Sequence, residues 1–111
     1  MKLKIMALAL VVCAYPAIAE NTKLANAECS FNAYMMFEVT KEPQFEKAGD
    51  YFNKKAFSSL NRVKMKQRIK EQIAMSRSAI KEQSDMVEYS FHLQPRPAFN
   101  GNTCAEQYAI R

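Results

Sequence analysis

Apolar residues recur three or four positions apart along most of the chain. The first such series is Leu24, Ala27, Phe31, Met35 and Val39, and a second set fills a neighbouring face: Cys29, Ala33, Met36 and Phe37. This spacing predicts an amphipathic helix that begins at Asn21 or Thr22, either of which can cap it, and runs to about Thr40. Because apolar side chains cover most of its circumference, we expect this helix to be the most buried.

A second helix is expected from about residue 44 to residue 57. Its apolar face repeats at i, i+3, i+7 and i+11: Phe45, Ala48, Phe52 and Ala56. Pro43 disfavours helical geometry in the residue before it and suits the first turn of the next helix. Gly49 costs about 1 kcal/mol in a helix relative to alanine, so the pattern favours a kink or a break near Gly49 and Asp50.

A third, long and charged helix is predicted from about Ser59 to Glu88, with Ser58 or Ser59 as its cap. Its thin apolar stripe consists of Leu60, Val63, Ile69, Ile73, Ile80 and Val87. The last three lie seven residues apart, as in a packed helical hairpin or a short coiled-coil seam. A stripe this narrow fits a helix that packs on one side only.

The end of the chain changes character. Residues 91–99 are expected to be extended, because the run Gln94-Pro95-Arg96-Pro97 favours polyproline geometry. Asn100-Gly101 is a turn signal, and Thr103 with Glu106 matches a capping box that opens a short helix to about Ile110. The predicted fold is therefore all-α: a small three- to four-helix bundle with an extended proline-containing segment before a short C-terminal helix.

The first nineteen residues have the features of a secretory signal peptide. A basic start precedes an apolar run from Ile5 to Ala14, and Ala17-Ile18-Ala19 supplies the small residues at a cleavage site. Ten apolar residues are too few to cross about 30 Å of hydrocarbon. We expect cleavage after Ala19, leaving residues 20–111 as one periplasmic or secreted helical domain. Lipidation at Cys13 is the disfavoured alternative, because Val12 stands where a small residue is normal.

Cleavage of the signal peptide changes the net charge and the cysteine count of the chain. It removes two lysines, so Lys+Arg falls from 16 to 14 and the net charge from +5 to +3. At 111 residues the chain is too short for a multidomain enzyme or a Rossmann-sized nucleotide site.

The two remaining cysteines, Cys29 and Cys104, predict a disulfide in an exported chain. In the chain-entropy model, a disulfide that closes a loop of about 76 residues stabilises the folded state by roughly 4–5 kcal/mol.

Catalytic and cofactor chemistry finds little support in the sequence. His92 is the single histidine, and no pattern places a base beside a nucleophile, so no enzyme is expected. The sequence has no CxxCH motif, which would indicate haem, and no regular array of methionines, which would indicate copper. No cofactor is therefore expected. Asp85, Glu88 and His92, at i, i+3 and i+7, are weak metal candidates. The stronger interpretation is an ordinary solvated acidic ridge that includes Glu82.

The basic stretch is the most distinctive feature. Residues 51–70 contain seven Lys and Arg and no acid. On one continuous helix, five cations lie in a row: Arg62, Lys66, Lys70, Arg77 and Lys81. An exported protein seldom meets nucleic acid, so this basic ridge is expected to face an acidic protein or an anionic lipid surface. The alternative is a solvated face that only keeps the protein soluble.

Charge is also segregated along the chain, and this suits recognition of a complementary partner. We therefore expect a small, exported, non-catalytic binding protein that uses the basic ridge to bind an acidic protein. In architecture alone it resembles secreted-effector immunity proteins and periplasmic enzyme inhibitors, with no shared motif. The alternatives are a periplasmic stress chaperone, similar in architecture to small helical acid-stress chaperones, and an envelope protein bound to anionic lipid. The thin stripe of the third helix also allows a homodimer.

Overall fold

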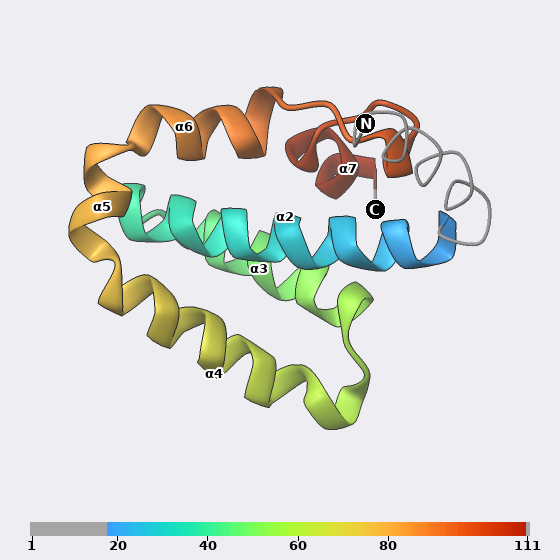
Figure 1. Ribbon diagram of the computed structural model, residues 1–111, viewed down its shortest axis with the longest axis horizontal. Helices are drawn as coiled ribbons and strands as arrows, with labels where there is room; N and C mark the ends of the chain where they lie inside the picture. The colour runs from blue at the N-terminus through green and yellow to red at the C-terminus, as the bar shows by residue number, and fades with distance from the viewer. Residues whose placement is uncertain (1–17, 111) are drawn as a thin grey trace, which may run out of the picture.

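The computed structural model describes residues 18–110, with side chains from Thr22 onward. Within this range the chain is entirely helical or loop, with no strand (Figure 1). The elements are α2 (Ile18–Thr40), α3 (Pro43–Ala56), α4 (Ser59–Met75), α5 (Arg77–Glu82), α6 (Ser84–Glu88), the π-helical turn η1 (Tyr89–Leu93), the 3-10 turn η2 (Pro97–Phe99) and α7 (Cys104–Ile110). The predicted all-α fold is confirmed. Residues 1–17 of the predicted signal peptide, with Cys13, lie outside the described residues.

Helix α2 is the centre of the molecule. It contacts α3, α4, α5, α6, η1 and η2, and Ala25, Cys29, Ala33, Tyr34 and Met36 are buried along it. This agrees with the expectation that the first helix is the most buried. The helix begins at Ile18, so the predicted cap at position 21 or 22 is wrong. Residues 18–21 contain neither proline nor glycine, so the helix includes them.

The helical hairpin of α2 and α3 forms the first half of the core. α2 ends as predicted, where Lys41 adopts a left-handed conformation (φ 63°) and its N–H donates to the carbonyl of Phe37 at 2.7 Å. Pro43 then opens α3. The predicted apolar face is buried: Phe45, Ala48, Phe52 and Ala56. The hairpin thus follows from local sequence signals and one apolar stripe on each helix.

The expected kink at Gly49 is absent, because α3 runs unbroken from Pro43 to Ala56. Gly49 instead permits close helix packing. A Cβ placed on it would lie 2.5 Å from Cε1 of the buried Tyr34 ring. Beside this contact, the hydroxyl of Ser30 donates to the Gly49 carbonyl at 2.9 Å. The glycine therefore sets how closely α2 and α3 approach.

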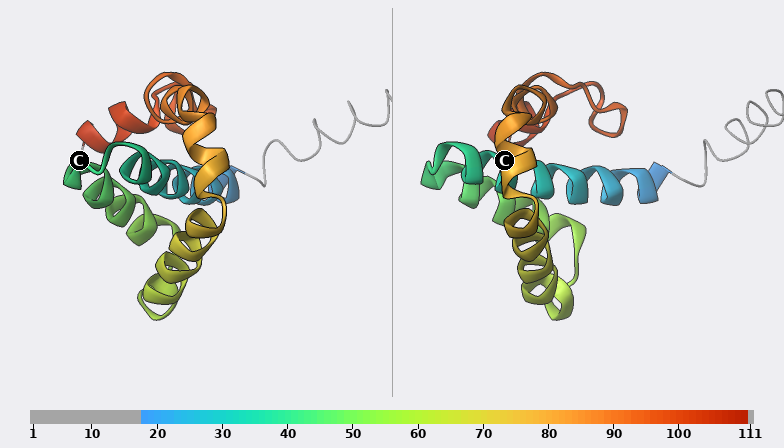
Figure 2. Two further views of the ribbon diagram at one scale, coloured as in Figure 1. Left: turned by 90° about the vertical axis from the view of Figure 1, so that its left-hand side faces the viewer. Right: turned by 60° about the vertical axis from the view of Figure 1, so that its left-hand side comes forward.

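The single long helix predicted over residues 59–88 is wrong. Ser76 (φ −109°, ψ 20°) and Gln83 (φ −109°, ψ 32°) interrupt it and separate α4, α5 and α6. A straight helix of that length would extend about 45 Å and run past α2. With two interruptions the chain bends around α2, so that α4 and α6 lie on opposite sides of it (Figures 1 and 2).

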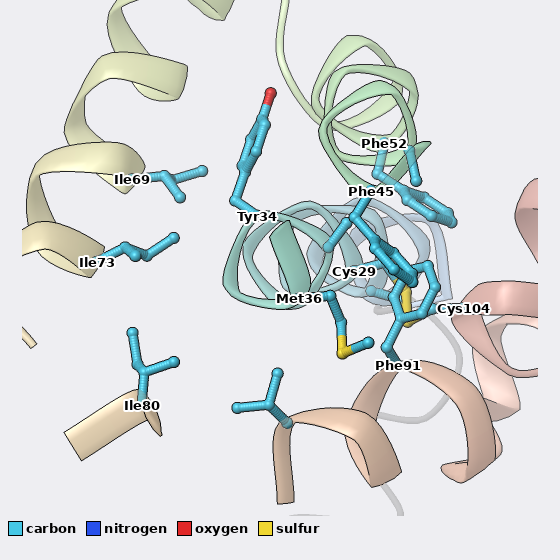
Figure 3. Close-up of a cluster of buried hydrophobic side chains, with 14 of the residues drawn as sticks. Cys29, Tyr34, Met36, Phe45, Phe52, Ile69, Ile73, Ile80, Phe91 and Cys104 are labelled. Carbon is cyan, nitrogen blue, oxygen red and sulfur yellow. A yellow bond between two sulfur atoms is a disulfide. The ribbon is translucent and has the colours of Figure 1, made fainter. Parts of the chain in front are cut away.

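These bends keep most of the thin stripe in contact with the core. Ile69, Ile73 and Ile80 lie on one side of α2, while Phe45, Phe52, Phe91 and the disulfide lie on the other (Figure 3). Val87 is buried as well. The first two residues of the predicted stripe do not belong to it. Leu60 and Val63 are 91% and 74% exposed.

The expected extended stretch over residues 91–99 is present only in part, because residues 97–99 form the 3-10 turn η2. Residues 89–93 are π-helical rather than extended, and the N–H of Gln94 donates to the Tyr89 carbonyl at 2.8 Å. Extended backbone begins at Gln94. The predicted turn is present, with Asn100 at φ 59° and Gly101 at φ 88°. The π-turn lets Phe91 fill the core before the prolines end the helix.

The capping box and the disulfide fix α7. The Thr103 N–H donates to Glu106 Oε1 at 2.9 Å, and the Glu106 N–H donates to Thr103 Oγ1 at 3.1 Å, as the sequence predicted. Cys29 and Cys104 form the predicted disulfide, with Cα atoms 5.6 Å apart, and neither is exposed. The bond joins α7 to the central helix.

Candidate functional site

The five cations of the predicted basic ridge do not form one row. Arg62, Lys66 and Lys70 belong to α4, whereas Arg77 and Lys81 lie beyond the interruption at Ser76, on α5. Lys81 is exposed and Arg62 is half-buried. The structure therefore brings together Lys66 and Lys70 and separates them from the α5 members of the set.

Lys66, Lys70 and Arg77 form ion pairs with acids of the α2–α3 hairpin, and the two lysines share Glu46. Lys66 Nζ lies 2.9 Å from Asp50 Oδ1 and 3.8 Å from Glu46 Oε2. Lys70 Nζ lies 2.7 Å from the same oxygen of Glu46. In this arrangement these lysines hold α4 against the hairpin, which reduces their availability to another molecule.

Tyr34 lies at the centre of this contact. The ammonium groups of Lys66 and Lys70 are each 5.8 Å from its ring centroid. Its hydroxyl donates to Asp50. Burial, the hydrogen bond to Asp50, and the charges of Asp50 and Glu46 together raise the pKa of Tyr34 far above its ordinary value. The phenol therefore remains a neutral donor that links α2 to α3 beneath α4.

A second charged contact fixes the turn into α5. Arg77 Nε lies 2.6 Å from Glu38 Oε2, and Lys41 Nζ lies 3.3 Å from that oxygen. Glu38 is only 8% exposed. Burial alone would raise its pKa, but the hydrogen bonds and charges of Arg77 and Lys41 outweigh burial, so the pKa of Glu38 lies below its ordinary value. Glu38 is thus a buried carboxylate kept ionised by two cations.

The outer face of α4 presents a different surface. Leu60 and Val63 project into solvent beside the exposed Gln67. A shallow hollow of about 460 Å³ follows this side of the helix and is lined by Val63, Lys66, Gln67, Lys70, Glu71 and Ala74. Exposed Lys64 and Arg68 flank it, and among residues 22–110 neither forms an ion pair. We call Leu60, Val63, Lys64, Gln67 and Arg68 the basic face.

The sequence held a signal for this face. Val63 and Ile69 are six residues apart, which separates them by about 120° around a helix and places them on different faces. Leu60, Val63 and Gln67, at i, i+3 and i+7, share a face of their own. Separating the two series would have located the exposed apolar residues.

A second exposed apolar strip lies on α6 and η1. Met86 is 60%, Tyr89 45% and Leu93 64% exposed. Three exposed acids accompany the strip: Glu82 at the end of α5, and Asp85 and Glu88 on α6. We call these six residues the acidic face. Large side chains left in solvent beside charges of one sign are typical of a surface that binds another molecule.

The weak metal candidates are not assembled into a site. Within the described part of the chain, no group of three His, Cys, Asp or Glu side chains is placed to hold an ion. The π-helical turn changes the helical register after Glu88. The ring of His92 instead packs edge-on against Phe91 and Phe45, with centroids 5.0 and 5.9 Å away.

Arg96 is a buried cation that the sequence did not single out. Its Nη1 forms an ion pair with Glu28 on α2, and Nη2 lies 3.5 Å from the Ser90 carbonyl. Its backbone N–H donates to the Asn102 carbonyl at 3.0 Å, closing the loop around the turn. These contacts account for Arg96 as a residue that fastens the proline segment to α2.

The fold defines a small all-α protein whose C-terminal helix is joined to its central helix by a disulfide. None of the described helices has the length and apolar character needed to cross a membrane. No known protein family matches the chain, and neither a curated protein nor a solved structure is similar to it.

Proposed function

We propose that the chain is a small, exported, non-catalytic binding protein that docks an acidic surface of a protein partner on the basic face of α4. The observation that carries this proposal is the exposure of Leu60 and Val63 beside Lys64 and Arg68, two cations without an ion pair among residues 22–110. Apolar side chains with charges at their rim are the composition of a protein interface. The proposal moves the binding surface from the predicted ridge to the adjacent side of α4.

The export part of the proposal is supported by the signal-peptide features of residues 1–19 and by the disulfide, which is compatible with an oxidising compartment. The internal ion pairs of Lys66 and Lys70 support the choice of face. They hold α4 in place, and the side carrying Leu60 and Val63 remains uncovered. A surface that is held rigid before binding loses less conformational entropy on docking.

Identification of a partner tests the proposal. The purified protein would retain partners from a cell-envelope extract, each identified by mass spectrometry, purified and titrated by calorimetry. Leu60→Ser with Val63→Ser should weaken binding about tenfold or more, because it removes apolar contacts at the centre of the interface. Met75→Ser, an exposed change on the same helix, is the matched control.

Equal affinity of the Leu60/Val63 variant and the native protein for every identified partner would show that this face is not the site. Binding to vesicles of anionic lipid, in the absence of any protein partner, would also overturn the proposal and favour attachment to the envelope.

A second candidate function is an acid-activated chaperone. One observation favours it: α4 and α5 are tied to the hairpin by ion pairs that all end on carboxylates, Glu38, Glu46 and Asp50. Protonation would remove these attractions and leave α4 held mainly by Ile69 and Ile73. Release of α4 would expose those side chains and Tyr34 to unfolded clients.

The pH dependence of stability checks this candidate. Because the folded pKa of Glu38 lies below its ordinary value, its contribution is complete above about pH 5 and is lost as the pH falls through the folded pKa. We expect the free energy of unfolding, measured by urea titration, to decrease below about pH 4.5 and client aggregation to be suppressed there. Glu38→Gln should be less stable at pH 7 and show a smaller decrease on acidification, whereas the exposed Glu82→Gln should match the native protein. No suppression of aggregation at any pH would remove the chaperone candidate.

A further inference from the structure

We propose that a second copy of this chain is the acidic partner of the basic face, and that it binds through its acidic face on α6 and η1. The proposal rests on the proposed function and names the partner of the same surface. It is drawn from two exposed apolar strips in one molecule that carry opposite charges.

The two strips share a spacing over one helical turn. Met86 and Tyr89 lie at i and i+3, as do Leu60 and Val63 on α4. Leu93 follows within the π-helical turn, which places it outside this α-helical register. Side chains at equal intervals on two helices can interdigitate over that turn. The acidic strip carries three large apolar groups, and the basic strip offers two with a neighbouring hollow.

The charges favour this pairing over the symmetrical ones. Contact between two α4 helices would place Lys64 and Arg68 opposite the same cations, and contact between two α6 helices would do the same with Asp85 and Glu88. Both arrangements are repulsive. Contact of α4 with the α6 of another copy instead brings these cations against carboxylates. All four side chains are exposed, and none forms an ion pair within residues 22–110.

The fold makes this contact intermolecular. α4 and α6 lie on opposite sides of α2, with α5 joining them (Figures 1 and 2). A chain therefore cannot place its own acidic face on its own basic face. Two copies can satisfy both surfaces at once in a closed dimer, and a single contact repeated from copy to copy gives a larger assembly.

Charge reversal provides the test. Lys64→Glu with Arg68→Glu makes both faces acidic, and Asp85→Lys with Glu88→Lys makes both basic. By sedimentation velocity at low salt, we expect the native protein to associate as its concentration rises, and each variant alone to associate at least about tenfold more weakly. An equal mixture of the two variants should recover native association, because acidic α4 then meets basic α6, and acidic α6 meets basic α4.

The controls separate this effect from net charge and from misfolding. Lys47→Glu with Lys54→Glu changes exposed residues of α3 by the same charge and should leave association unchanged. Far-ultraviolet circular dichroism should be the same for all variants. A native protein that stays monomeric at every concentration, or reversed variants that do not associate when mixed, would overturn the inference. In either case, loss of an identified foreign partner in the Leu60/Val63 variant would leave the proposed function standing.

Discussion

Replacing Cys29 and Cys104 together by alanine is expected to lower the free energy of unfolding by about 4 kcal/mol. The bond joins residues 75 positions apart, so its loss frees a long loop in the unfolded chain. Both cysteines are fully buried beside Phe52 and Phe91, and truncation also leaves a gap there (Figure 3). The loss is comparable to the whole stability of a small domain.

Thermal unfolding followed by circular dichroism measures this effect. The midpoint of the double variant should fall by roughly 15 °C or more. Reduction of the native protein should produce a similar decrease, while reductant should not change the variant. If the variant melts within a few degrees of the native protein, the packing of α7 on α3 and η1 would be sufficient without the bond.

Gly49→Ala is expected to destabilise the protein, although the same change stabilises an unhindered helix by about 1 kcal/mol. The added methyl group would lie 2.5 to 2.8 Å from three atoms of the Tyr34 ring. That ring cannot move aside easily, because it is buried and its hydroxyl is bonded to Asp50. Overpacking of this kind costs about 1–3 kcal/mol. After the gain in helix propensity is subtracted, we expect a net loss of up to about 2 kcal/mol.

A double-mutant cycle in urea isolates the clash from helix propensity. In a Tyr34→Leu background the obstructing ring is absent, and Gly49→Ala should become stabilising by about 1 kcal/mol. The change of sign is the expected signature. Stabilisation by Gly49→Ala in the native background would mean that α2 and α3 separate readily at this point.

Much of the first half of the fold was predictable because its determinants are local. Pro43 marks the boundary between α2 and α3, and the spacing from Phe45 to Ala56 marks the buried face. The capping box of Thr103 and Glu106 was equally accessible. The close approach at Gly49 was not, because it depends on Tyr34 in another helix.

The second half of the fold was harder to predict from the sequence, because its structure also depends on contacts between helices. Ser76 and Gln83 are not residues that usually break helices, and their role follows from the need of Ile80 and Val87 to reach α2. The five cations of the basic ridge were predicted to lie in one row because residues 59–88 were expected to form one continuous helix. The pairing of Arg77 with Glu38 across 39 residues could not be read from local charge patterns.

The interruptions at Ser76 and Gln83 also determine how the molecule can open. A continuous helix would detach from α2 as one unit, whereas three segments joined at single residues can detach in steps. Each is held by few buried apolar residues: α4 by Ile69 and Ile73, α5 by Ile80 and α6 by Val87. The amides of α2 are protected by its own hydrogen bonds and by α3, so hydrogen exchange should be faster in α4, α5 and α6 than in α2. Local stability is therefore graded around α2, with transient openings that leave the central hairpin intact.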